Sequence, residues 1–144
     1  MIYMDFRDSL WPRSDNLILY GHNMRDGSRF GTLRRFERSS YMKKFPVFQF
    51  VELYETAEYV PIAIFHTTVL TTDPDYYPFD RVNFTDGTDF DQYISDVKSR
   101  SLINIPLTAE FGEKLLTLVT CSSSMDRGRL VIVLREIRPD ERFE

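Results

Sequence analysis

One cysteine and two histidines are the side chains in this sequence best suited to nucleophilic or metal chemistry. Cys121 is the only cysteine among the 144 residues, so it cannot form an intramolecular disulfide. Together with His22 and His66 it falls short of a closed zinc site unless carboxylates complete the ligand set. Cys121 is therefore either a small buried hydrophobic residue, as lone cysteines usually are, or a reactive nucleophile. We expect no metal and no cofactor.

A cysteine nucleophile needs a low thiol pKa or a nearby base, which is usually a histidine that the fold brings close. Cys121 follows the apolar run 115–120, and His22 follows the apolar run 17–20 and one glycine. If these two runs are adjacent strands that point the same way, both side chains emerge at one rim of the sheet. His66 lies inside another apolar run, where a structural role is more typical.

Arg129 is a candidate for the third group of such a site. It begins the next apolar run, eight residues after Cys121, and an arginine there can reach back over the cysteine. A guanidinium at that point is suited to stabilising the oxyanion of an acyl-transfer intermediate. Taken alone, Arg129 is more typical of a surface charge.

The elements that must position these residues are mostly strands. One longer helix is predicted over residues 86–99, with Thr88 as its cap and one apolar face. Two of the strands, residues 46–53 and 59–70, are predicted to form a long hairpin. We therefore expect a mainly β, barrel-like domain with one longer helix, short helical turns near residues 108–112, and about six strands over residues 1–6, 17–20, 46–53, 59–70, 115–120 and 130–137.

The composition excludes several classes of protein. Apolar residues make up 42% and charged residues 28%, which are values of an ordinary globular domain and exclude a disordered chain. The net charge of −4 argues against a nucleic-acid partner, although Arg34, Arg35 and Arg38 form a basic cluster in the stretch 26–45, which has the apolar spacing of a helical face. No apolar run reaches the ~18 to 20 residues that span a bilayer, and the first residues lack the order of a signal peptide.

Two sequence blocks resemble a known family. Residues 16–30, NLILYGHNMRDGSRF, resemble the class B sortase pattern N-x-I-I-Y-G-H-N-M-K-D-G-S-x-F, and residues 117–121, TLVTC, resemble the sortase signature T-L-x-T-C. Residues 129–133, RLVIV, are similar to the start of the family's last strand, with its arginine. The resemblance runs over nearly the whole chain, which we expect to be a single sortase-like catalytic domain, residues 1–144.

The resemblance implies a cysteine transpeptidase of the Gram-positive cell surface. Cys121 would attack the threonine carbonyl of an N-P-x-T-G or N-P-x-T-N sorting signal and form a thioacyl enzyme, which an amine of the cell wall or of a pilin resolves. His22 would act as general acid and then as base, and Arg129 would hold the substrate and stabilise negative charge. The partners implied are the sorting-signal peptide of a surface protein and the amine nucleophile.

The resemblance also implies a substrate groove lined by Tyr20 and Asn23 of the first block and by Val119, Thr120 and Ser122 around the cysteine. At several of these positions the backbone would make the contact. Val119 stands where serine is common in class B sortases, so a side-chain hydrogen bond to the substrate is absent there.

The sequence departs from the family at its start. Class B sortases carry a membrane anchor, an N-terminal helix and two further strands before the segment that resembles residues 1–6. We therefore expect six of eight barrel strands here, and a homodimer or a rearrangement that covers the open sheet edge. The alternative function is a catalytically impaired, sortase-like module for binding or assembly. A papain-like hydrolase is disfavoured, since that family places its cysteine on a helix near the N-terminus.

Overall fold

The structure is a computed structural model that describes residues 2–4, 14–21, 48–51, 56–68, 72, 74, 76–121 and 128–141. For residues 2–4, 48–51, 56 and 121 the description covers the backbone alone. The elements are β1 (Ile2–Met4), β2 (Asn16–Gly21), β3 (Phe48–Val51), β4 (Thr56–Thr68), α2 (Gly87–Arg100), β5 (Leu115–Cys121) and β6 (Gly128–Glu136).

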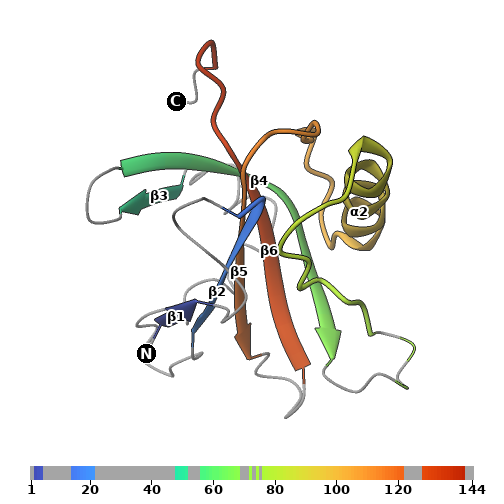
Figure 1. The fold of residues 1–144 in the computed structure, drawn as a ribbon. Helices are drawn as coiled ribbons and strands as arrows, with labels where there is room; N and C mark the ends of the chain where they lie inside the picture. Colours follow the sequence, from blue (N-terminus) through green and yellow to red (C-terminus); the bar gives the residue numbers. More distant parts are fainter. Residues whose placement is uncertain are drawn as a thin grey trace.

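The six strands form one twisted sheet in the order β1-β2-β5-β6-β4-β3 (Figure 1). The pair β2–β5 is parallel, and the other four pairs are antiparallel. For the described residues, the prediction of a mainly β fold with six strands and one longer helix is confirmed. The described sheet does not close on itself, because β1 and β3 are its two edges.

Both faces of the central strands are buried, which explains why their sequences are continuous apolar runs instead of alternating ones. The helix α2 covers one face (Figure 1). Its buried residues Phe90, Tyr93, Ile94 and Val97 pack in one cluster with Ile18, Phe65, Val119, Val131 and Val133. The opposite face carries a second cluster, which includes Leu17, Ile64, Leu116, Leu118, Leu130, Ile132 and Leu134. The core therefore fixes the positions of β2, β5 and β6 from two sides.

The helix begins one residue later than predicted, and its cap is not Thr88. Asp86 is the N-cap, and its carboxylate accepts a hydrogen bond from the Asp89 backbone N–H at 2.8 Å. Thr88 is the second helical residue, so it lies too far into the first turn to act as the cap. A carboxylate at the cap also favours the positive end of the helix dipole.

Strand boundaries differ from the predicted ones by a few residues. The first strand is shorter than residues 1–6, and the hairpin is longer on its second side. Residues 55–58 were predicted to join the two strands of that hairpin, but Thr56, Ala57 and Glu58 already pair with β3. The predicted helical face in residues 26–45, with its basic cluster, lies outside the described residues. No helix among the described residues is long and apolar enough to cross a membrane.

Lys98, in the last turn of α2, ties the helix to the sheet. Its ammonium donates hydrogen bonds to the backbone carbonyls of Ile62 and Ile105, each at 2.9 Å, and of Leu107. Burial lowers the pKa of Lys98, yet the three acceptors match the three protons of the ammonium group. The side chain thus joins β4, α2 and the segment after the helix.

We expect Lys98→Met to lower the free energy of unfolding by about 2 kcal/mol, because three carbonyls lose a charged donor while the apolar stem is kept. The measurement is urea unfolding followed by circular dichroism. Lys114→Met is the matched control, since Lys114 is half-buried and makes no side-chain hydrogen bond to the described residues. Equal midpoints for the two variants would contradict this role of Lys98.

Candidate active site

The parallel pair β2–β5 brings together the ends of the two strands that precede the candidate histidine and cysteine. Tyr20 pairs with Val119 and Gly21 pairs with Thr120, so β2 and β5 terminate side by side, at the same end of the sheet. The prediction that these strands are adjacent and point the same way is confirmed. Cys121 is the last residue of β5. His22 follows β2 directly and lies outside the described residues.

Arg129 lies directly across from Cys121 in the antiparallel pair β5–β6. Its side chain is half-buried, and its Nη1 donates a hydrogen bond to the carbonyl of Gly128 at 2.8 Å. Within the part of the chain that the structure describes, no carboxylate forms an ion pair with Arg129. Among the described residues, the only partner of this guanidinium, across from the cysteine position, is therefore the Gly128 carbonyl.

Three of the predicted substrate-lining residues fall within the described residues, and all three are wholly or partly buried. Tyr20 is half-buried and packs against the core cluster beneath α2. Val119 and Thr120 are each 1% exposed, and each pairs with β2 on one side and β6 on the other, so both residues are part of the buried sheet. The hydroxyl of Thr120 has no hydrogen-bond partner among the described residues. Asn23 and Ser122 lie outside the described residues.

A buried polar network lies where β2 and β5 begin, at the opposite end from the candidate site, and the sequence pattern did not predict it. The Asn16 side chain is fully buried, accepts a hydrogen bond from the Thr117 hydroxyl at 2.8 Å, and donates one to the Arg81 carbonyl at 2.7 Å. Its backbone N–H donates to the carbonyl of Val82. Asp and Asn before a strand are typical of a turn, so the sequence did not predict that Asn16 fixes the register of β2 and β5.

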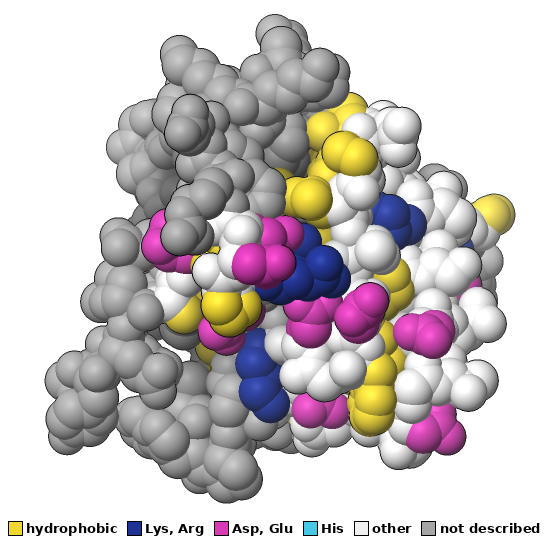
Figure 2. Space-filling model, turned by 90° about the horizontal axis from the view of Figure 1, so that it is seen from above, with side chains coloured by type: hydrophobic (Ala, Val, Ile, Leu, Met, Phe, Trp, Pro, Cys, Tyr) yellow, Lys and Arg dark blue, Asp and Glu magenta, His cyan; other side chains and the backbone are white. Residues whose placement is uncertain are grey.

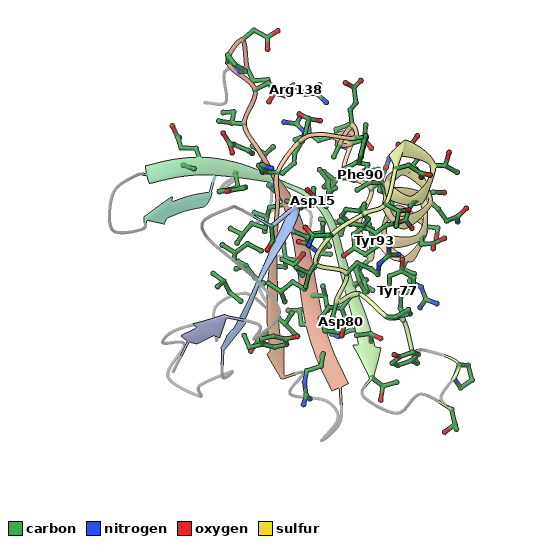
Figure 3. All side chains as sticks on the ribbon, viewed as in Figure 1. Asp15, Tyr77, Asp80, Phe90, Tyr93 and Arg138 are labelled. Carbon is green, nitrogen blue, oxygen red and sulfur yellow. The ribbon has the colours of Figure 1, made fainter. Side chains whose placement is uncertain are left out.

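Residues 76–86, which connect to the start of α2, pass over the face of the sheet that α2 covers. Tyr93 of α2 donates a hydrogen bond from its hydroxyl to the carbonyl of Phe79 at 2.8 Å, and burial raises the pKa of Tyr93. Asp15 accepts one from the backbone N–H of Phe84 at 2.9 Å. Figure 3 shows Tyr93 and Tyr77 near α2, with Asp80 below them in the view and over the strands. This segment is therefore anchored at several points beside the strands of the candidate site.

The described residues contain no group of three His, Cys, Asp or Glu side chains that could hold a metal ion. What the described geometry does provide is a row across three strands, with the end of β2, Cys121 and Arg129 at neighbouring register positions. A cysteine and a cation at paired strand positions are two of the groups that nucleophilic acyl transfer uses.

Comparisons with known proteins agree with this geometry. No protein-family model matches the chain. Sortase B of Listeria monocytogenes is 31% identical over 133 residues, which are 91% of this chain and 52% of that protein. A Staphylococcus aureus sortase B–substrate complex superposes with a TM-score of 0.83 at 27% identity, over 97% of this chain and 63% of that one. A sortase B complexed with triglycine gives a TM-score of 0.81 at 27% identity, over 96% and 63%.

The sheet order, the parallel pairing of β2 with β5, and these superpositions define the fold as that of a sortase. Sortases are a family of cysteine transpeptidases. Within that family, the chain is similar to the class B proteins, sortase B, over 91% of its own length at 31% identity. It spans about half the length of the sortase B sequences that it matches.

Proposed function

We propose that this chain carries the transpeptidase site of a class B sortase, with Cys121 as nucleophile, His22 as general acid and base, and Arg129 as the cation that stabilises developing negative charge. The observation that carries the proposal is the row of register positions at which the end of β2, Cys121 and Arg129 are neighbours. The comparison with a sortase B–substrate complex supports a peptide substrate.

The proposed reaction is a transfer of an acyl group in two steps. The Cys121 thiolate attacks the threonine carbonyl of an N-P-x-T-G or N-P-x-T-N signal, and the guanidinium of Arg129 stabilises the oxyanion of the tetrahedral intermediate. The threonine C–N bond breaks, His22 protonates the leaving amine, and a thioester remains on Cys121. In the second step an amine attacks the thioester carbonyl and His22 takes a proton from that amine. The C–S bond breaks, the new amide leaves, and the Cys121 thiolate is regenerated.

The acceptor in this proposal is an amine of a cell-wall peptide or a pilin. A sortase B solved with triglycine supports an amine-bearing peptide as the second partner. We propose the cell surface as the place where the protein works, in keeping with its family.

A second candidate function is a sortase-like module for binding or assembly, alone or as a homodimer. The observation that favours it is that the described sheet is open, with β1 and β3 as its two edges. The same peptide experiment separates the two functions, because a binding module forms no covalent intermediate.

Incubation with an N-P-x-T-G-type peptide is expected to produce a threonyl thioester on the protein, seen as added intact mass. Protein pretreated with iodoacetamide is the control, because the sequence has a single thiol and its alkylation removes the nucleophile. Adduct in the untreated protein alone supports the transpeptidase. Peptide binding without adduct or cleavage, at high protein concentration, supports the module.

A further inference from the structure

The row of register positions that contains Cys121 and Arg129 continues into a third strand. Thr67 of β4 is the partner of Arg129, just as Cys121 of β5 is its partner on the other side. Neighbouring strands lie about 5 Å apart, so Thr67 is one strand from Arg129 and two strands from the cysteine position. Nothing in the sequence pattern drew attention to Thr67.

Thr67 and Arg129 lie on the face of the sheet that α2 covers. Phe65 and Val131 belong to the core cluster beneath the helix, and each is two residues away from one member of the pair. Since side chains alternate along a strand, residues two apart share a face. A segment whose backbone is held by Thr67 therefore lies on the same face of the sheet as Arg129.

The hydroxyl of Thr67 holds the chain that passes over this face. It is buried, at 3% exposure, and accepts a hydrogen bond from the Tyr77 backbone N–H at 2.9 Å. The Tyr77 ring packs edge-on against Phe65, with centroids 6.0 Å apart, and the Arg100 guanidinium lies 4.8 Å from its centroid. Its hydroxyl donates to Asp96 at 3.3 Å. Figure 3 shows Tyr77 between the sheet and α2.

Tyr77 is held in two places, by its side chain and by its backbone N–H. The ring is held by Phe65, Arg100 and Asp96, so it would remain in place if the backbone bond were lost. The backbone N–H is held by Thr67, and this bond sets how closely residues 76–79 approach β4 and the Arg129 position. Pro78 is exposed at the outer side of this segment, next to Phe79, which is half-buried.

We propose that Thr67 is a positioning residue for peptide binding: its hydroxyl fixes residues 76–79 as a wall beside Arg129. The inference rests on the proposed function for its substrate, a peptide, and adds a residue that contacts neither the peptide nor the reacting atoms. Thr67 acts on how well the peptide is held, and the thiol chemistry at Cys121 does not depend on it.

Thr67→Val tests this role, because valine keeps the shape of threonine and removes the acceptor for the Tyr77 N–H. We expect KM for an N-P-x-T-G-type peptide to rise about fivefold, the effect of one lost hydrogen bond. We expect kcat, and the rate of Cys121 alkylation by iodoacetamide at each pH, to stay within about twofold of wild type. The reason is that Thr67 affects peptide binding and not the chemistry of the thiol. Thr67→Ser, which restores the hydroxyl, should return KM to the wild-type value. Thr108→Val, at an exposed loop position, is the matched control.

Amide hydrogen exchange gives a second measurement that needs no turnover. Exchange at the Tyr77 N–H should be faster in Thr67→Val than in wild type, while exchange at Val131 in β6 is unchanged. An unchanged KM, a fall in kcat alone, a serine variant as weak as the valine one, or an unchanged Tyr77 exchange rate would each overturn the inference. Failure of the proposed function would be seen separately, as the absence of a thiol-dependent adduct in wild type.

Discussion

Cys121→Ala is expected to abolish peptide cleavage and adduct formation, with a fall in kcat of roughly 10⁴-fold or more, as for loss of the nucleophile in other enzymes of covalent catalysis. The chain has one thiol, so no second cysteine can take over. In the proposed mechanism His22 and Arg129 only assist the nucleophile, so neither can replace it. The measurement is separation of cleaved from intact peptide by chromatography, together with intact mass of the protein.

The alanine variant should still bind peptide and unfold at the wild-type temperature, which separates loss of chemistry from loss of fold. The register of β5 supports this expectation, because Val119 and Thr120 continue the buried ladder up to the strand end. Cys121→Ser keeps a side chain of similar size, and its hydroxyl is a weaker nucleophile at neutral pH. Cleavage of the peptide by Cys121→Ala at the wild-type rate would show that Cys121 is not the nucleophile.

Glu141→Gln is expected to lower the free energy of unfolding by about 3 kcal/mol, because it leaves the buried guanidinium of Arg135 without its counter-charge. Arg135 is 1% exposed, and its Nη1 and Nη2 each donate to one carboxylate oxygen of Glu141 at 2.7 Å. Its Nε donates to the Thr108 carbonyl. A glutamine amide would turn an N–H₂ donor toward a guanidinium donor, so it cannot replace the bidentate pair.

Urea unfolding measures this effect, and Glu136→Gln, which neutralises an exposed carboxylate, is the matched control. Acidic and basic side chains lie side by side on this end of the molecule (Figure 2), the end at which Figure 3 places Arg138. Arg138 pairs with Glu113 there, at 2.9 Å. A loss in Glu141→Gln no larger than in Glu136→Gln would show that the pair with Arg135 is dispensable.

The same pair predicts a dependence of stability on pH. The hydrogen bonds from Arg135 lower the pKa of Glu141 from its ordinary 4.5 to about 2 in the folded chain. Between these two values the unfolded chain binds the proton and the folded chain does not, so stability falls as the pH drops. The difference between wild type and Glu141→Gln should be constant above about pH 5 and shrink from there toward pH 2.

Much of the fold could be predicted because the apolar runs are long and continuous. The strands β5 and β6 were predicted within two residues, and α2 within one. The cap was assigned to Thr88 instead of Asp86 because both residue types serve as caps and their spacing alone does not select one. The second side of the hairpin was predicted too short because the charged residues Glu55 and Glu58 suggested a turn, although Glu58 lies on a strand.

For the candidate site, strand ends could be predicted but side-chain roles could not. Cys121 and Arg129 lie at adjacent strand positions, as the hairpin-like spacing suggested. Val119 and Thr120 were predicted to line a groove, yet both side chains are buried, since β5 is covered on both faces. Asn16 and Thr67 escaped notice because their partners come from distant segments, and a single sequence gives no signal of such contacts. The roles of Cys121, His22 and Arg129 stay predictions.

The strand β5 pairs in parallel with β2 and antiparallel with β6, and this difference sets the order in which the site assembles during folding. Its partner β6 follows it through a short connection, so Cys121 meets Arg129 by a local contact that closes quickly. Its other partner, β2, is distant, as the sequence separation of 101 residues between Asn16 and Thr117 shows. Contacts of such sequence separation form slowly, because the entropy of closing a long loop must be overcome first. The cysteine and arginine positions therefore come together early, and β2, the strand that precedes the histidine in the sequence, joins them in a later step of folding.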